Sequence, residues 1–184
     1  IAVVAAGGGS NFQAIQEAIL RGELDAMIDV VITDKPGAYV VTRAVGFGIP
    51  VLELVPKTFE SKAHYEQAIV DELKKRDIGW VVLAGYMRLV GEVLLGAYEN
   101  RIVNIHPSLL PSFPGKDAIG QAFAHGVKVT GVTVHFVDAG MDTGPIIAQH
   151  AVDVVEGDLA ATEARIHEVE HVLYTKTLKR LFGK

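Results

Sequence analysis

Residues 1–20 read IAVVAAGGGSNFQAIQEAIL, an apolar run followed by three glycines and an amphipathic stretch. The run over residues 1–6 has the length of a buried strand. Apolar residues after the glycines recur at helical spacing, which predicts a helix over Ser10–Leu20. A strand, a glycine loop and a helix in this order are typical of the first unit of a parallel α/β sheet.

The same alternation continues along the chain. Further strands are predicted over residues 29–33, 51–55 and 80–84, with helices over residues 39–46 and 59–76 between them. The second half contains predicted strands over residues 101–106, 129–137 and 144–155, and a closing helix over residues 162–181. The run over residues 129–137 alternates more strictly than the earlier strands, as antiparallel strands do. We therefore expect a Rossmann-like α/β fold with a doubly wound, mostly parallel sheet and an antiparallel extension in the C-terminal half.

Length and composition narrow the class of protein. The 184 residues fit one domain, residues 1–184, and a hydrophobic content of 49% excludes a disordered chain. The net charge of −5 argues against broad nucleic-acid binding, and no apolar run approaches the roughly 18 residues of a membrane span. The absence of cysteine excludes disulfides and thiolate chemistry. No signal peptide is visible, which favours a cytoplasmic location.

The glycine loop is the first candidate site. Glycines at residues 7–9 let the backbone approach an anion, and the following helix offers free N–H groups and a positive dipole end. Ser10 and Gln13 match a capping box that would start the helix. The third glycine of the dinucleotide motif is replaced by Phe12, so a phosphate site, a dinucleotide site and a plain turn stay open. Asp34, at the end of the second strand, fits either a ribose-binding acid or a turn residue.

Asn104 and His106 form the second candidate site. They are two residues apart in a predicted strand, so both side chains leave the same face. Pro107 ends the strand and places the pair at the carboxyl edge, where open α/β sheets bind ligands. An amide beside an imidazole can stabilise a developing oxyanion and move a proton. The alternative is a strand end with a solvated histidine and a capping asparagine.

The loop over residues 137–145 carries two carboxylates, Asp138 and Asp142. Aspartate and glycine are common in turns, so both carboxylates fit a purely structural role. A catalytic role requires Asp142 to reach His106, where it would orient the imidazole and favour its charged form.

Residues 167–171 read HEVEH and match the H-E-x-x-H motif of zinc peptidases. A zinc site of this kind needs a third protein ligand, and no His, Asp or Glu follows His171. Tyr174 occupies the glycine position of the extended motif. We therefore expect a polar helix face and no metal.

Taken in order, GGGSNFQAI, LAGYMRLV, NIHPSLLPSFPG, GVTVHFVDAGMDTGPI and EVEH resemble the motifs of the phosphoribosylglycinamide formyltransferase family, folate-dependent enzymes of purine biosynthesis. The resemblance extends over essentially the whole chain. It implies transfer of a formyl group from the co-substrate 10-formyltetrahydrofolate to the amine of phosphoribosylglycinamide, without a metal. Methionyl-tRNA formyltransferases share the core but usually have glycine where this chain has Pro107. Formyltetrahydrofolate hydrolases lack the GGGSN loop.

The resemblance also implies residue roles. The implied catalytic residues are Asn104, His106 and Asp142. The implied phosphate and ribotide ligands are Gly9, Ser10, Asn11 and Glu170. The implied folate ligands are Lys62, Met87, Arg88, Leu89, Val90, Asn104, Asp138, Ala139, Gly140 and Met141. Residues 1–100 would then form a phosphate-binding half and residues 101–184 a catalytic and folate-binding half.

Two other functions stay open at this point: a formyltetrahydrofolate hydrolase-like activity and a non-catalytic nucleotide-binding module. The expected partners are the two small-molecule substrates, without nucleic acid or membrane, and the chain is a monomer or a homodimer. Both substrates are anionic while the protein is net negative. Lys62, Arg88 and nearby amides must therefore supply local positive potential.

Overall fold

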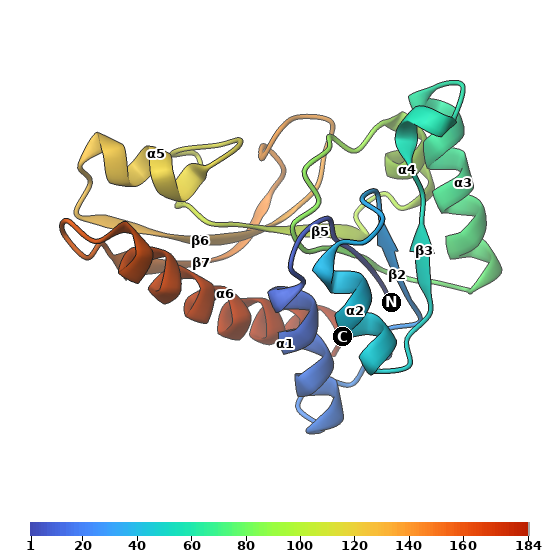
Figure 1. Ribbon diagram of the computed structural model, residues 1–184, viewed down its shortest axis with the longest axis horizontal. Helices are drawn as coiled ribbons and strands as arrows, with labels where there is room; N and C mark the ends of the chain where they lie inside the picture. Colours follow the sequence, from blue (N-terminus) through green and yellow to red (C-terminus); the bar gives the residue numbers. More distant parts are fainter. Residues whose placement is uncertain (184) are drawn as a thin grey trace.

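The computed structural model describes residues 1–183 as a seven-stranded sheet in the order β3-β2-β1-β4-β5-β6-β7 (Figure 1). The strands are β1 Ala2–Val4, β2 Val30–Thr33, β3 Val51–Glu53, β4 Val81–Leu83, β5 Ile102–His106, β6 Val129–Phe136 and β7 Ile146–Asp153. Strands β1 to β5 pair in parallel, whereas β6 and β7 are antiparallel to their neighbours. The predicted fold class is confirmed.

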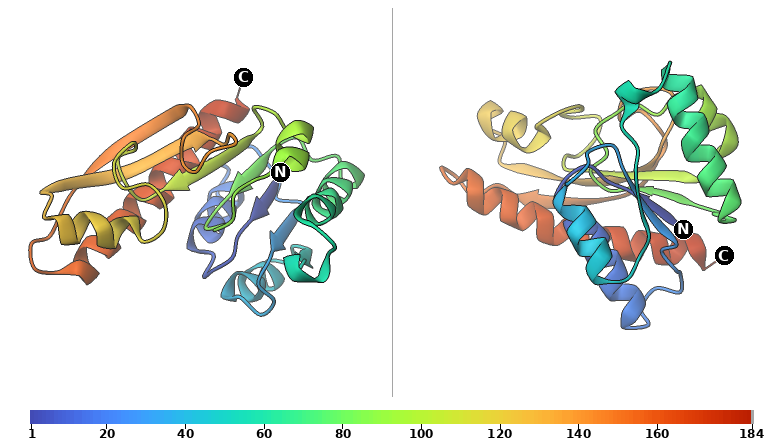
Figure 2. Two further views of the ribbon diagram at one scale, coloured as in Figure 1. Left: turned by 90° about the horizontal axis from the view of Figure 1, so that it is seen from above. Right: turned by 45° about the vertical axis from the view of Figure 1, so that its right-hand side comes forward.

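Helices cover both faces of this sheet (Figures 1 and 2). They are α1 Ser10–Leu20, α2 Tyr39–Gly46, α3 Lys62–Lys75, α4 Glu92–Ala97, α5 Ala118–His125 and α6 Leu159–Phe182, with a 3₁₀ turn η1 at Pro56–Thr58. Buried side chains of α1, α2 and α6, among them Phe12 and Tyr174, pack on one face. Those of α3 and α4, among them Tyr65 and Leu94, pack on the other. Both faces of the parallel strands are thereby removed from water, as their apolar sequences require.

The pairing of β5 with β6 sets the position of the polar side chains. Asn104 lies opposite His135, and His106 lies opposite Thr133. Residues directly opposite each other in an antiparallel pair share one face of the sheet. Four polar side chains are therefore gathered on one face at the end of β5.

Helix α6 is anchored to the two central strands β4 and β5. The Tyr174 hydroxyl donates to the carbonyl oxygens of Leu83 in β4 at 2.6 Å and of Val103 in β5 at 3.2 Å. Glu170 lies one turn before Tyr174 and is thus held by the same anchor. Within residues 1–183, no helix, α6 included, is both long and apolar enough to span a bilayer.

Some local predictions were wrong. Helix α1 is capped by Gly9 in the left-handed conformation (φ 79°), and Ser10 is its first helical residue. The Gln13 side chain pairs with Glu17 and Arg43 instead of closing a capping box. Helices α4 and α5 and the turn η1, which have six, eight and three residues, were not predicted, because such short segments carry little periodicity to distinguish a helix from a loop.

Candidate active site

A cavity of about 450 Å³ opens at the carboxyl edge of the parallel strands. The glycine loop, the β4–α4 loop, the end of β5, the β6–β7 loop and one face of α6 line it together. Of the predicted site residues, it is lined by Gly9, Ser10, Asn11, Met87, Arg88, Leu89, Val90, Asn104, His106, Gly140, Met141, Asp142 and Glu170. The predicted residues Lys62, Asp138 and Ala139 lie outside this lining.

The glycine loop is shaped for an anion. A Cβ on Gly9 would lie 2.7 Å from Cγ2 of Val40, so the position requires glycine for space as well as for its positive φ. Helix α2 holds the loop: the N–H of Val40 donates to the carbonyl of Gly7 at 3.1 Å, and Arg43 Nε donates to that of Gly8 at 2.8 Å. No side chain within residues 1–183 caps α1. Its first N–H groups therefore stay available to a phosphate.

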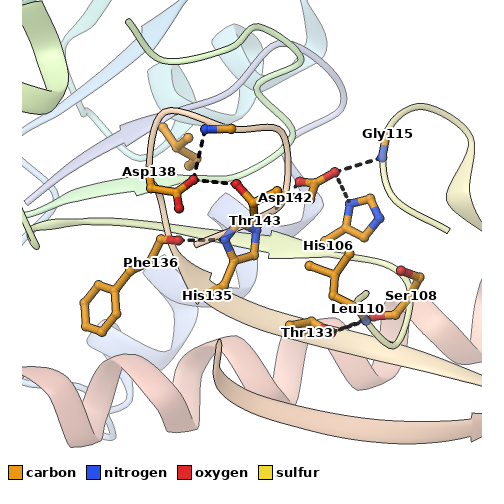
Figure 3. A network of polar contacts seen from close by, with 12 residues as sticks. His106, Ser108, Leu110, Gly115, Thr133, His135, Phe136, Asp138, Asp142 and Thr143 are labelled. Carbon is orange, nitrogen blue, oxygen red and sulfur yellow. Dashed lines mark hydrogen bonds and ion pairs between the residues drawn. The ribbon is translucent and has the colours of Figure 1, made fainter. Parts of the chain in front are cut away.

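The second predicted cluster comes together at the end of β5 (Figure 3). His106 Nδ1 lies 3.5 Å from Asp142 Oδ2, which also accepts the backbone N–H of Gly115 at 2.8 Å. The other carboxylate oxygen, Oδ1, lies 3.7 Å from His135 Nε2. All three side chains are largely buried, with exposed fractions of 7%, 11% and 3% for His106, Asp142 and His135. One carboxylate therefore faces two imidazoles.

Each imidazole is placed between the carboxylate and a backbone carbonyl. His106 Nε2 lies 2.9 Å from the carbonyl oxygen of Phe113, and His135 Nδ1 lies 2.8 Å from that of Phe136. A carbonyl only accepts, so each ring donates to it and a neutral ring then turns a bare nitrogen toward Asp142. A protonated ring would donate on both sides, to the carbonyl and to the Asp142 carboxylate. Burial alone raises the pKa of the Asp142 carboxyl, but the His135 side chain, the Gly115 N–H and the charge of His106 together lower it below its usual value.

His135 is a site residue that the sequence analysis missed. It lines the cavity and is only 2% exposed. The signal in the sequence was a histidine in a strictly alternating strand. In the structure, this position pairs with Asn104. The contributions of Gly115 and Phe113 come from their backbone groups, which no side-chain pattern reveals.

The β6–β7 loop presents Asp142 to the histidines. The Asp138 carboxylate accepts the N–H of Gly140 at 3.0 Å and the hydroxyl of Thr143 at 2.7 Å, which closes the loop on itself. A Cβ on Gly144 would lie 1.8 Å from the carbonyl oxygen of Phe136, so only glycine fits there. Asp138 thus shapes the loop, as the structural alternative predicted, and Asp142 alone of the two carboxylates reaches the histidines.

The HEVEH segment contributes one face of α6 to the cavity. Glu170 is 5% exposed, and its carboxylate lies 2.5 Å from Nδ1 of the half-exposed His167. This hydrogen bond raises the pKa of His167, partial burial opposes it, and the charges of Glu170 and Glu163 add to it. Burial lowers the pKa of His171. Among residues 1–183 no group of three or more His, Cys, Asp or Glu side chains is arranged to hold a metal ion.

A second cavity, of about 630 Å³, lies beside the first between η1, the start of α3 and the β4–α4 loop. Lys57 and Lys62 line it, together with Arg88, which lines both cavities. The predicted folate residue Lys62 is therefore placed next to Met87, Arg88 and the rest of that predicted segment, although it does not reach the first cavity.

Comparison with known proteins gives consistent matches over the whole fold. The family model described as "Formyl transferase" matches residues 1–178. The chain is 52% identical over 183 residues to the phosphoribosylglycinamide formyltransferase of Bacillus subtilis, covering 99% of this chain and 94% of that protein. It is also similar to the crystal structure of phosphoribosylglycinamide formyltransferase from Bacillus halodurans, with a TM-score of 0.97 and 56% identity over 100% of this chain and 95% of that one. The glycinamide ribonucleotide transformylase 1 structure from Geobacillus kaustophilus has a TM-score of 0.95 and 57% identity, covering 98% of this chain and 96% of that one.

Proposed function

The chain belongs to the formyl transferase family, and we propose that it transfers the formyl group of 10-formyltetrahydrofolate to the amine of phosphoribosylglycinamide. It is an enzyme of purine biosynthesis by similarity to relatives of that name. One structural observation carries the assignment: a single cavity joins the glycine loop to Asn104, His106 and Asp142. A nucleotide-binding module would use the loop alone and leave this cluster without a purpose.

The two substrates are assigned to opposite parts of the cavity. Gly9, Ser10 and Asn11 hold the phosphate of phosphoribosylglycinamide through the free N–H groups of α1. Glu170 accepts hydrogen bonds from the ribose hydroxyls. The residues that hold the formyl donor are Met87, Arg88, Leu89, Val90, Asp138, Ala139, Gly140 and Met141, with Lys62 toward its glutamate end. This arrangement directs the amine of one substrate at the formyl group of the other.

The reaction is an acyl transfer through a tetrahedral intermediate. The amine nitrogen forms a bond to the formyl carbon, and the formyl oxygen becomes an oxyanion. The bond from that carbon to N10 of the folate then breaks, so that the amine loses a proton and N10 gains one. Neither step forms a covalent bond to the protein.

Asn104 and His106 stabilise the oxyanion, and Asp142 assists the proton transfers. The Asn104 amide and the His106 imidazole are hydrogen-bond donors at the cavity wall, and donors aimed at an oxyanion are each worth roughly 10²–10³ in rate. In the structure, the His106 Nε2 proton is directed at the Phe113 carbonyl oxygen. The formyl oxygen would compete with that carbonyl for the same proton. The lowered pKa of Asp142 keeps its carboxylate ionised, and we assign to it the acceptance of the proton that the amine releases.

We extend the proposal to domain organisation, partners and location. The chain works as one domain, in which residues 1–100 supply the phosphate loop and residues 101–184 the catalytic cluster. Two residues do not follow this division. Arg88 lies in the first half but is assigned to the formyl donor, and Glu170 lies in the second half but is assigned to phosphoribosylglycinamide. Both partners are small molecules, and the net charge of −5 opposes nucleic-acid binding. Small phosphorylated metabolites are substrates of the cell interior, which supports a cytoplasmic location.

The test is to follow the deformylated folate by absorbance with and without phosphoribosylglycinamide. We expect turnover only when phosphoribosylglycinamide is present, and its loss in a folded His106→Ala variant. Asn104→Ala should behave similarly, and the double variant should lose less than the product of the two single effects because both residues act on one oxyanion. Equal turnover of the folate without phosphoribosylglycinamide would replace the proposal by a hydrolase.

A further inference from the structure

Asp34 is a buried carboxylate that neither the turn chemistry nor the proposed reaction explains. It follows β2 and is 5% exposed. The Thr33 hydroxyl, not Asp34, accepts the N–H of Lys35 at 3.2 Å in the turn that follows. The Asp34 Oδ1 atom is buried without a hydrogen-bond partner among the residues that the structure describes. A buried charge of this kind needs compensation from a nearby cation.

That cation is Arg88, 54 residues further along the chain. Its Nε donates to Asp34 Oδ2 at 2.6 Å, a short charge-assisted hydrogen bond. The Asp34 side chain is 2% exposed and that of Arg88 is 49% exposed. The pair therefore joins an immobilised buried carboxylate to a guanidinium that extends into solvent.

The geometry leaves the outer edge of the guanidinium free. Because the group is planar, a hydrogen bond that fixes Nε also restricts the directions of the two terminal amino groups. Within residues 1–183, no hydrogen bond other than that to Asp34 involves the Arg88 side chain. Arg88 lies where the catalytic cavity and the second cavity share their walls, together with Tyr86, Met87 and Leu89. The free edge thus belongs to the boundary between the two cavities.

The second cavity is suited to the anionic end of the formyl donor. Lys57, Lys62 and Arg88 all line it, and Phe59 and Tyr65 add largely apolar walls. A folate has an aromatic middle and a glutamate with two carboxylates. Arginine binds a carboxylate through two parallel hydrogen bonds when its planar group is correctly aimed.

We propose that Asp34 is a positioning residue for the formyl donor: by holding Arg88 Nε, it directs the two terminal amino groups of Arg88 at a carboxylate of the donor's glutamate. The inference rests on the proposed function. It makes Asp34 a determinant of donor affinity although it does not touch the donor. Pairing with Asp34 reduces the positive potential that Arg88 offers to an anionic donor. The positioning role explains why the carboxylate is nevertheless placed there.

Two substitutions separate orientation from charge. Asp34→Asn keeps an oxygen that accepts the Nε hydrogen, so the guanidinium stays oriented while the opposing negative charge is removed. Asp34→Ala removes the acceptor and leaves Arg88 to sample many rotamers. The exposed Asp71, which accepts from Gln67 on α3, provides a control: Asp71→Ala removes a carboxylate that does not contact Arg88.

The decisive measurement compares two donors, 10-formyltetrahydrofolate and 10-formyltetrahydropteroate, which lacks the glutamate. In the unmodified protein, we expect loss of the glutamate to raise KM. In Asp34→Ala, we expect KM for the complete donor to rise by about 10-fold, the size of one lost oriented charged hydrogen bond, with kcat and the KM of the truncated donor unchanged. Asp34→Asn and Asp71→Ala should keep the KM ratio of the unmodified protein. Adding Asp34→Ala to Arg88→Ala should have no further effect on KM, because both changes remove the same contact.

Several outcomes would overturn the inference. A KM ratio in Asp34→Ala equal to that of the unmodified protein would exclude a positioning role. So would an equal loss of kcat with both donors, which indicates a general structural defect. If urea unfolding shows Asp34→Ala to be unstable, the similar-sized Asp34→Leu takes its place. The ratio of the equilibrium dissociation constants of tetrahydropteroate and tetrahydrofolate tests the same contact without catalysis. If the protein shows no formyl transfer but Asp34→Ala still abolishes the difference between these two constants, only the proposed function is refuted.

Discussion

Replacing Gly9 by alanine tests whether the glycine loop has the shape on which the assignment depends. Gly9 has a φ of +79°, where an alanine costs roughly 1–2 kcal/mol. The new Cβ would also lie 2.7 Å from Val40 Cγ2, 2.8 Å from Val40 Cβ and 3.0 Å from Val40 Cα. Overpacking of this kind costs about 1–3 kcal/mol, because the backbone of α2 cannot move aside freely. We therefore expect Gly9→Ala to lower the free energy of unfolding by roughly 2–5 kcal/mol.

Two other glycines separate the contributions. Gly22 has a similar φ of +76° but no atom within 4 Å of its Cβ position, so Gly22→Ala should show only the conformational cost of roughly 1–2 kcal/mol. Gly8 has open space and no positive φ, so Gly8→Ala should be close to neutral. Urea unfolding of the three variants gives the free energies directly. The difference between Gly9→Ala and Gly22→Ala measures the contact with Val40.

The same variant has a functional readout. A shift of Gly9 displaces the N–H groups of Ser10 and Asn11, so KM for phosphoribosylglycinamide should rise while KM for the formyl donor stays near its normal value. Gly22→Ala should change neither constant. A Gly9→Ala protein that is no less stable than Gly22→Ala would contradict the steric reasoning. An unchanged KM for phosphoribosylglycinamide, despite the loss of stability, would show that the loop does not bind the phosphate.

Two further predictions concern ionisable groups in the cavity. Asp142→Asn should lower kcat by about 10²-fold or more with little change in KM for the donor, because it removes the carboxylate that faces both imidazoles. Steady-state kinetics checks this, and an unchanged kcat would show that the Asp142 carboxylate takes no part in the proton transfers. His167→Gln should cost stability at or below pH 6.5, by about 0.2–1 kcal/mol for a half-exposed pair. Because the folded-state pKa of His167 is raised, this stabilisation is complete below the unfolded value near 6.5 and is lost as pH rises through the folded value. Urea unfolding at pH 6 and pH 9 checks this, and an equal effect at both pH values would exclude the charged pair with Glu170.

The sequence was informative where local pattern and local structure coincide. The continuous apolar run at β4 and the glycine break after β1 predict the parallel sheet, because burial on both faces leaves no alternation. Asn104 and His106 were predicted as a pair because period two places them on one face. The span of α1 was predicted correctly, but the capping box of Ser10 and Gln13 was wrong for a local reason: Gly9 adopts a left-handed cap that leaves Ser10 inside the helix.

The rest depends on contacts between distant parts of the chain. The carboxylate of Asp142 reaches His106 across 36 positions of the printed sequence, through a loop whose course depends on Asp138 and Gly144. Asp34 meets Arg88 across 54 positions, at the meeting point of two βα units. Neither pairing leaves a periodic signal, since Asp142 and Asp34 both stand in loops, where the turn chemistry of Asp and Gly provides a sufficient local explanation.

A protein with a net charge of −5 can bind two anionic substrates because its positive potential is local and oriented. The side-chain cations near the cavity are partly engaged: Arg88 pairs with Asp34, and Arg43 donates to the carbonyl of Gly8. In the proposed arrangement, the phosphate is met mainly by backbone N–H groups at the start of α1, which follows the left-handed Gly9. At the proposed reacting centre, the imidazoles of His106 and His135 both face the single carboxylate of Asp142. Each of these donors is held by a defined partner, so substrate recognition depends on where the donors point. A substitution that leaves the charge unchanged but alters an orientation, such as Gly9→Ala, is therefore expected to weaken substrate binding.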